Sequence, residues 1–69
     1  MAKFSERLKE LRIEKGLSQN SLSKEVGCSQ GAIAKWESNL QQPNADTIIM
    51  FAKYFDVSTD YLLGLEDWT

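Results

Sequence analysis

Apolar residues recur every three or four positions along most of this chain, with polar residues between them. Near its start Phe4, Leu8 and Leu11 follow this spacing, which places them on one face of a helix. A later segment repeats the pattern in its own apolar residues, Ile48, Phe51, Ala52 and Phe55. No stretch alternates with period two for long enough to predict a strand. We therefore expect an all-α fold.

The apolar segments are separated by residues that end and begin helices. Residues that accept the left-handed conformation closing a helix stand at Gly16, Gly27, Asn39, Asp56 and Gly64. N-cap residue types follow the first four of these, at Ser18, Ser29, Asn44 and Ser58. Together the two signals predict helices over residues 3–15, 19–26, 30–38, 45–55 and 59–63. Apolar residues just outside helix ends are expected to seal the corners of the core: Leu17, Val57 and Leu65.

Residues 19–38 have the composition that two helices meeting at a sharp angle require. Such a pair needs apolar inner faces, a small residue where the backbones approach, and a glycine that turns the chain. Ser23 supplies the small residue and Gly27 the turn. The apolar set is Leu22, Val26, Cys28, Ile33 and Trp36. This segment is expected to be a helix-turn-helix.

Composition limits the kinds of chemistry available to the chain. Its 69 residues fit a single domain, 1–69. There is no histidine, and Cys28 is the single cysteine, so an internal disulfide and a multi-cysteine metal site are excluded. We find no nucleophile–base set, no phosphate loop, no membrane-length apolar run and no signal-peptide pattern. We expect a cytoplasmic protein that is not an enzyme and that uses no metal or cofactor.

The charge is unevenly distributed, although the net charge is only −2. Residues 1–40 carry seven lysines and arginines against five glutamates, whereas residues 41–69 carry one lysine against five acidic residues. Local field governs binding more than the total charge does. A nucleic-acid partner for the first part of the chain is therefore compatible with the acidic total.

Five stretches of this sequence are similar to one known family. They are FSERLKELR, KGLSQ, VGCSQGAIAKWES, QQP and VSTDYLLG. From Phe4 to about Gly64 the chain resembles the phage-repressor helix-turn-helix family, that of lambda repressor, Cro and the xenobiotic-response-element proteins. The resemblance implies a compact five-helix domain that binds operator DNA in the major groove through helix 30–38, usually as a symmetric dimer.

Residue roles follow from this resemblance and from side-chain chemistry. Base contacts are expected from Gln30, Gly31, Ala32, Ala34 and Lys35. Phosphate contacts are expected from Arg12, Ser18, Gln19, Ser38, Asn39 and Gln41. The family also implies an ion pair between Arg12 and Glu37. Gly31 weakens the helix in which it lies.

For several residues a structural role competes with a functional one. Trp36 is expected in the core rather than stacked on a base, and Cys28 as an inert buried thiol rather than a redox sensor. Gln30 and Lys35 have the alternative of being merely solvated. In the segment 60–69 a self-association surface is expected from Leu63, Leu65 and Trp68, the alternative being that Trp68 folds back on its own core.

The leading functional hypothesis is a sequence-specific regulator of transcription, a repressor of prokaryotic or phage type. It is expected to bind a near-palindromic operator as a homodimer in the nucleoid. The loop 39–42 has no lysine or arginine, which predicts a shallow salt dependence. The acidic balance of the chain and this charge-poor loop also favour an alternative, a protein-interaction module such as an antitoxin or accessory subunit on the same fold. A complete small regulator and an excised N-terminal domain are both compatible with the sequence.

Overall fold

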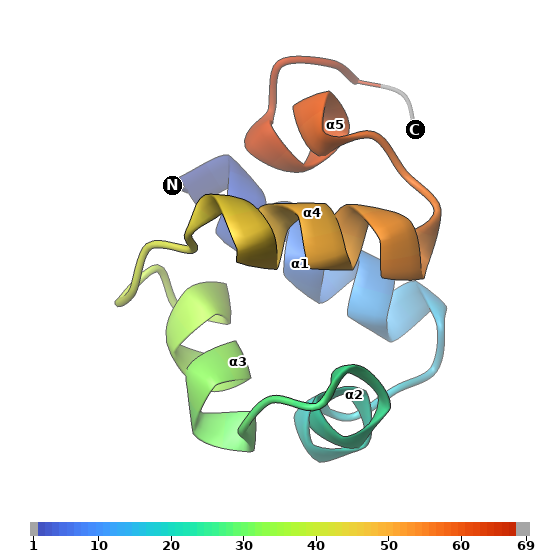
Figure 1. Ribbon diagram of the computed structural model, residues 1–69, viewed down its shortest axis with the longest axis vertical. Helices are drawn as coiled ribbons and strands as arrows, with labels where there is room; N and C mark the ends of the chain where they lie inside the picture. The colour runs from blue at the N-terminus through green and yellow to red at the C-terminus, as the bar shows by residue number, and fades with distance from the viewer. Residues whose placement is uncertain (1, 68–69) are drawn as a thin grey trace.

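Five helices make up the computed structural model, which describes residues 2–67 (Figure 1). They are α1 (Ala2–Glu14), α2 (Gln19–Val26), α3 (Gln30–Glu37), α4 (Ala45–Phe55) and α5 (Thr59–Leu63). No strand occurs within the described range. The predicted all-α fold is confirmed, and each boundary lies within one residue of its prediction.

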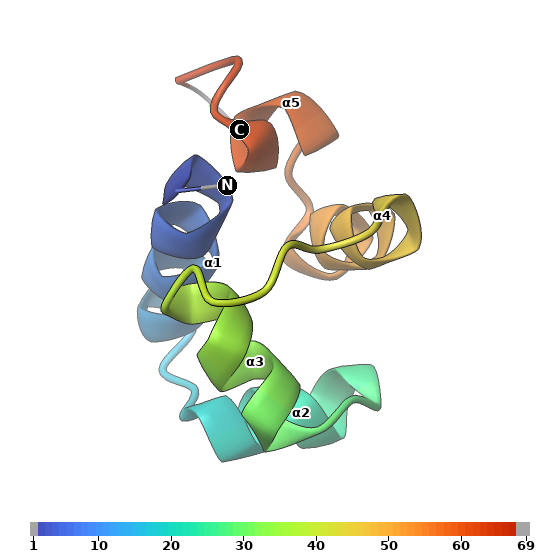
Figure 2. The same ribbon diagram turned by 90° about the vertical axis from the view of Figure 1, so that its left-hand side faces the viewer.

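The α2–α3 pair lies at one end of the molecule and α5 at the other, with α1 and α4 between them (Figure 2). Helix α1 contacts both α3 and α5, while α2 packs on α3 and α4 packs on α5. Helix α1 therefore connects the two ends of the fold and can fix the position of α3.

The core centres on Phe51 of α4, which is fully buried. Its ring meets the edge of Trp36 at 5.7 Å between centroids and lies 6.2 Å from the ring of Phe4. Helices α1, α3 and α4 thus share one aromatic cluster. The buried apolar residues of the core are Phe4, Leu8, Leu11, Leu22, Ile33, Trp36, Ile48, Phe51, Ala52 and Leu62.

Every predicted helix stop and start is found. The residues with positive φ are Gly16, Gly27, Asn39, Asp56 and Gly64. Each predicted N-cap side chain accepts a backbone N–H three residues ahead, at Ser18, Ser29, Asn44 and Ser58. These signals depend on local backbone geometry, so they can be recognised without knowledge of the tertiary contacts.

The corner-sealing prediction is right at two positions and wrong at the third. Leu17 and Val57 pack against the core, but Leu65 is 73% exposed. Arg7 accounts for the difference, because its Nη1 donates to the backbone oxygens of Tyr61 (3.0 Å) and Glu66 (2.8 Å). The guanidinium also lies 4.0 Å over the Tyr61 ring. The segment after α5 is thus held by a polar contact rather than by its leucine.

Gly64 is a position at which this segment lies close against α1. Its φ is +81°, and a Cβ there would lie 2.6 Å from both Cβ and Cγ of Lys3. Gly27 offers a comparison, since its φ is +75° but a Cβ would meet nothing within 4 Å. The two positions share the conformational requirement for glycine and differ in the space available.

We expect Gly64→Ala to destabilise the domain more than Gly27→Ala. The left-handed conformation costs an alanine about 1 kcal/mol, so Gly27→Ala should lower the free energy of unfolding by about that amount. Gly64→Ala adds a collision with Lys3 and should cost about 2 kcal/mol or more. Urea unfolding followed by far-UV circular dichroism measures both. Equal losses would show that the segment moves away from α1 without cost.

Candidate nucleic-acid interface

The turn between α2 and α3 is built from local signals and closed by two buried side chains. Gly27 ends α2 in the left-handed conformation, and the Ser29 hydroxyl caps α3 by accepting the N–H of Ala32 at 3.0 Å. Leu22 and Ile33 are fully buried on the inner faces. The predicted small residue, Ser23, is also buried, and its hydroxyl donates to the Asn20 oxygen at 2.6 Å. The helix-turn-helix geometry expected for residues 19–38 is present.

Helix α3 has a buried face and an outward face. Ile33 and Trp36 are buried, whereas Gln30, Gly31 and Lys35 are exposed. These three residues and half-buried Ala34 occupy positions 30, 31, 34 and 35, which share one side of a helix. The fold therefore presents most of the predicted base-contacting set on one open surface.

Ala32 differs from the other predicted base contacts. It is half-buried and packs against the core. Its methyl group therefore lies at the flank of the outward face, and its contact with a thymine methyl stays a prediction.

Trp36 is a core residue, as predicted. Its side chain is 7% exposed and meets the Phe51 ring edge-on, with an interplanar angle of 85°. The indole Nε1 is buried and has no hydrogen-bond partner among residues 2–67. A tryptophan enclosed in this way has no face left on which a base could stack.

Cys28 is half-buried in the turn and packs against the core. Desolvation raises the pKa of its thiol above the ordinary value, so the reactive thiolate form is disfavoured. This environment agrees with the predicted inert thiol.

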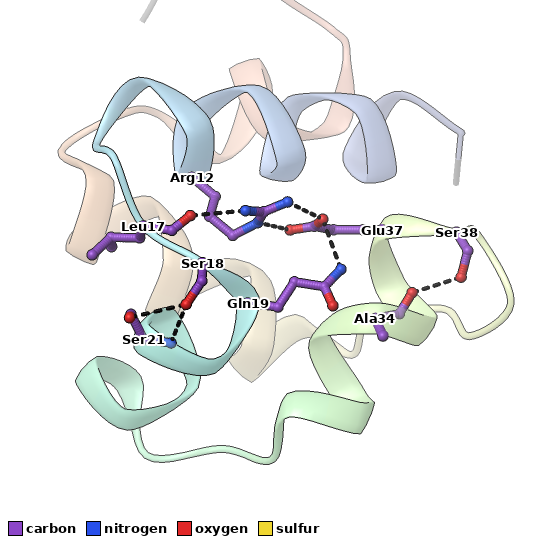
Figure 3. A network of polar contacts seen from close by, with 8 residues as sticks. All are labelled: Arg12, Leu17, Ser18, Gln19, Ser21, Ala34, Glu37 and Ser38. Atoms are coloured by element: carbon purple, nitrogen blue, oxygen red, sulfur yellow. Dashed lines mark hydrogen bonds and ion pairs between the residues drawn. The ribbon is translucent and has the colours of Figure 1, made fainter.

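An ion pair joins α1 to the last residue of α3. Arg12 Nε lies 2.7 Å from Glu37 Oε2, and Arg12 Nη2 donates to Glu37 Oε1 at 2.9 Å (Figure 3). The side chains are only 12% and 4% exposed, respectively. The hydrogen bond from Arg12 to Glu37 raises the pKa of the guanidinium against an opposing effect of desolvation. The pair implied by the family resemblance is present, in bidentate form.

Arg12 is turned inward by this pair. Its Nη1 also donates to the backbone oxygen of Leu17 at 2.8 Å, so three of its N–H groups are hydrogen-bonded within the domain (Figure 3). A phosphate contact by Arg12 stays a prediction, and these bonds limit the reach of the guanidinium.

Gln19 has a contact that the sequence did not reveal. It is the first residue of α2 and half-buried, and its Nε2 donates to Glu37 Oε1 at 3.2 Å. The two residues are 18 apart along the chain. Neither helix periodicity nor capping signals report on such a separation, so no local pattern could have indicated this contact.

The other predicted phosphate contacts lie at helix ends and in the loop after α3. The Ser18 hydroxyl caps α2, and the exposed Ser38 hydroxyl donates to the Ala34 oxygen at 2.6 Å. Asn39 and Gln41 are exposed, but their backbone N–H groups donate to oxygens of Trp36 and Lys35. Any phosphate contact by Asn39 or Gln41 therefore depends on the side chains, because the backbone N–H groups are already hydrogen-bonded within the domain.

The predicted self-association surface is divided. Leu63 is half-buried against the core, Leu65 is largely exposed, and Trp68 lies outside the described residues. Within residues 2–67 no group of acidic and cysteine side chains is arranged to hold a metal ion, and no helix is long and apolar enough to cross a membrane.

We expect Glu37→Ala to destabilise the domain strongly, because it leaves the Arg12 guanidinium desolvated without a partner. Removing one member of a buried pair costs about 3–5 kcal/mol. A matched control is Glu6→Ala, whose carboxylate is 63% exposed and lies 3.9 Å from Lys3. The control should change stability by about 0.5 kcal/mol or less. Thermal unfolding of both variants tests this expectation. Similar melting temperatures of Glu37→Ala and Glu6→Ala would refute a structural role for the pair.

Known proteins share this arrangement. Residues 8–62 match the helix-turn-helix family. The chain is similar to the HTH-type transcriptional activator BcrR of Enterococcus faecalis, with 39% identity over 64 residues, covering 93% of this chain and 31% of BcrR. It is also 36% identical over 60 residues to repressor protein C2 of Salmonella phage P22, covering 87% of this chain and 28% of that protein. The chain thus spans less than a third of the length of either relative.

Solved structures agree with the fold. The regulator of biofilm formation SinR, crystallised in complex with DNA, superposes with a TM-score of 0.79 and 31% identity, over 87% of this chain and 97% of that one. The P22 c2 repressor bound to a synthetic operator gives a TM-score of 0.78 and 34% identity, over 86% and 89% of the two chains. The match to the family over most of the chain and the agreement in fold lead to one conclusion: this chain belongs to the helix-turn-helix family.

Proposed function

We propose that this chain is the DNA-binding domain of a sequence-specific transcriptional regulator, a repressor that inserts α3 into the major groove. The observation that carries the proposal is that α3 has one face packed against the core and another face exposed to solvent. Ile33, Trp36 and Glu37 hold the helix from within, while Gln30 and Lys35 stand outside. Relatives named as transcriptional regulators and neighbours solved with DNA support the proposal.

Each exposed side chain has a defined task in this proposal. The Gln30 amide donates to N7 and accepts from N6 of adenine in a bidentate pair, and Lys35 donates to guanine O6 and N7 or to a phosphate. Ser18 and Gln19 lie at the N-terminus of α2, where free N–H groups and the helix dipole favour an anion. Phosphate contacts place the domain on the duplex, and α3 reads the sequence.

The proposed complex contains two copies of the domain. Two α3 helices in a symmetric dimer enter successive major grooves about 34–36 Å apart on a near-palindromic operator in the cytoplasm. A dimer supplies the affinity that one domain of net charge −2 with few exposed cations near α3 lacks. The rival expectation, a protein-interaction module on the same fold, differs in predicting that DNA binding is absent or does not depend on Gln30 and Lys35.

We expect Gln30→Ala and Lys35→Ala to weaken DNA binding without changing the fold. Loss of a bidentate base contact should reduce the affinity about 5- to 100-fold. Fluorescence anisotropy with a duplex selected from a random pool measures this, in a salt series. Lys53→Ala is the matched control, because this lysine is exposed on α4. Indifference to the first two substitutions would favour the protein-interaction module.

Gly31 provides a test with opposite signs. A Cβ at this position would meet nothing within 4 Å of the protein, so the fold itself does not require glycine there. Gly31→Ala should therefore stabilise α3 by about 0.5–1 kcal/mol. The same methyl group would occupy space next to the DNA and lower the affinity for the selected duplex. Unchanged affinity together with a higher melting temperature would place Gly31 outside the interface.

A further inference from the structure

Gln19 is the first residue of α2, and its side chain is held in place by a hydrogen bond. Its Nε2 lies 3.2 Å from Glu37 Oε1, across the gap between α2 and α3 (Figure 3). An ionised carboxylate can only accept hydrogen bonds, so it must face the amide nitrogen and not the amide oxygen. The contact with Glu37 therefore orients the Gln19 amide with its nitrogen, not its oxygen, toward α3.

Glu37 is itself fixed from the opposite side. Arg12 donates two hydrogen bonds to its carboxylate, and a third N–H of the guanidinium is bound to Leu17 just before α2. Side-chain exposure is 12% at Arg12 and 4% at Glu37, while Gln19 is half-buried at the rim. A chain of fixed contacts thus runs from α1 through the end of α3 to the beginning of α2.

We propose that Glu37 is a positioning residue for the DNA backbone and acts through Gln19. One N–H of the Gln19 amide is bound to Glu37, and the second is offered to a phosphate oxygen at the N-terminus of α2. This inference rests on the proposed DNA-binding function and goes beyond it by assigning how a phosphate contact is prepared. Holding the amide in the free protein removes rotamer freedom that would otherwise be lost on binding.

Arg12 makes this arrangement compatible with an anionic ligand. An unpaired carboxylate next to the N-terminus of α2 would repel a phosphate group. The bidentate guanidinium offsets that charge while leaving one carboxylate oxygen shared between Arg12 and Gln19. The same ion pair therefore stabilises the fold and keeps the Gln19 amide oriented for a phosphate group.

A structural role alone would make a different prediction. If the Arg12–Glu37 pair only holds α1 against α3, then the contribution of Gln19 to DNA affinity is independent of the pair. If Glu37 positions Gln19, the two contributions are coupled. A double-mutant cycle measures this coupling directly.

The cycle compares Gln19→Ala in two backgrounds, the natural chain and the double variant Arg12→Met with Glu37→Leu. Replacing both partners by apolar residues avoids an uncompensated buried charge and keeps the domain folded. Affinity is measured with a fluorescent duplex of about 20 base pairs, long enough for two half-sites. We expect Gln19→Ala to cost about 3- to 10-fold in the natural background and less than about 2-fold in the apolar one.

Gln30→Ala is the control in both backgrounds, because Gln30 lies on the outward face of α3. Its cost should be the same in each. If the costs of Gln19→Ala and Gln30→Ala both fall in the apolar background, the pair acts by orienting α3, and the proposal is overturned. Equal costs of Gln19→Ala in the two backgrounds would overturn it as well.

A measurement without DNA separates this proposal from the proposed function. The Gln19 side-chain amide signals in two-dimensional NMR should move to the position of solvated glutamine amides in the apolar background. Signals already at that position in the natural chain would disprove the Gln19–Glu37 contact. Absence of DNA binding by the natural chain, with the contact present, would instead refute the proposed function.

Discussion

The ion pair between Arg12 and Glu37 joins α1 to the helix whose outward face we propose meets DNA. Its guanidinium and carboxylate are almost completely withdrawn from solvent, and such charges are tolerated only in close, well-formed pairs. Moving α3 relative to α1 would separate them and expose each to the full cost of desolvation. The pair therefore stabilises the packing against α1 of the helix that carries Gln30 and Lys35.

The proposed DNA-binding surface belongs to an acidic chain, of net charge −2. The exposed residues on the outward face of α3 include one cation, Lys35, and the loop after α3 has none. Counterion release consequently contributes less free energy to binding than in strongly basic proteins. Preorganised polar groups gain importance in such a case, since their geometry rather than their charge determines what they contribute.

The features that were predictable from sequence are those that local backbone geometry decides. Gly27, Asp56 and Ser29 could be assigned from neighbouring residues alone, because left-handed stops and N-caps need no distant partner. Long-range contacts were not predictable in this way. The Gln19–Glu37 contact and the contacts of Arg7 with the end of the chain follow from the packing of helices. Only the family resemblance indicated the Arg12–Glu37 pair beforehand.

The contacts of Arg7 have a consequence for the order in which the domain opens. They join residues 54 and 59 positions apart, so they close large loops and carry the corresponding entropic cost. The strap they hold, residues 64–67, contains the exposed Leu65 and no residue of the buried core. Release of this strap leaves Phe51 and its neighbours enclosed. We therefore expect the backbone amides of residues 64–67 to exchange with solvent through a local opening that requires less free energy than unfolding of the whole domain, whereas the amides of α1 and α4 exchange through global unfolding.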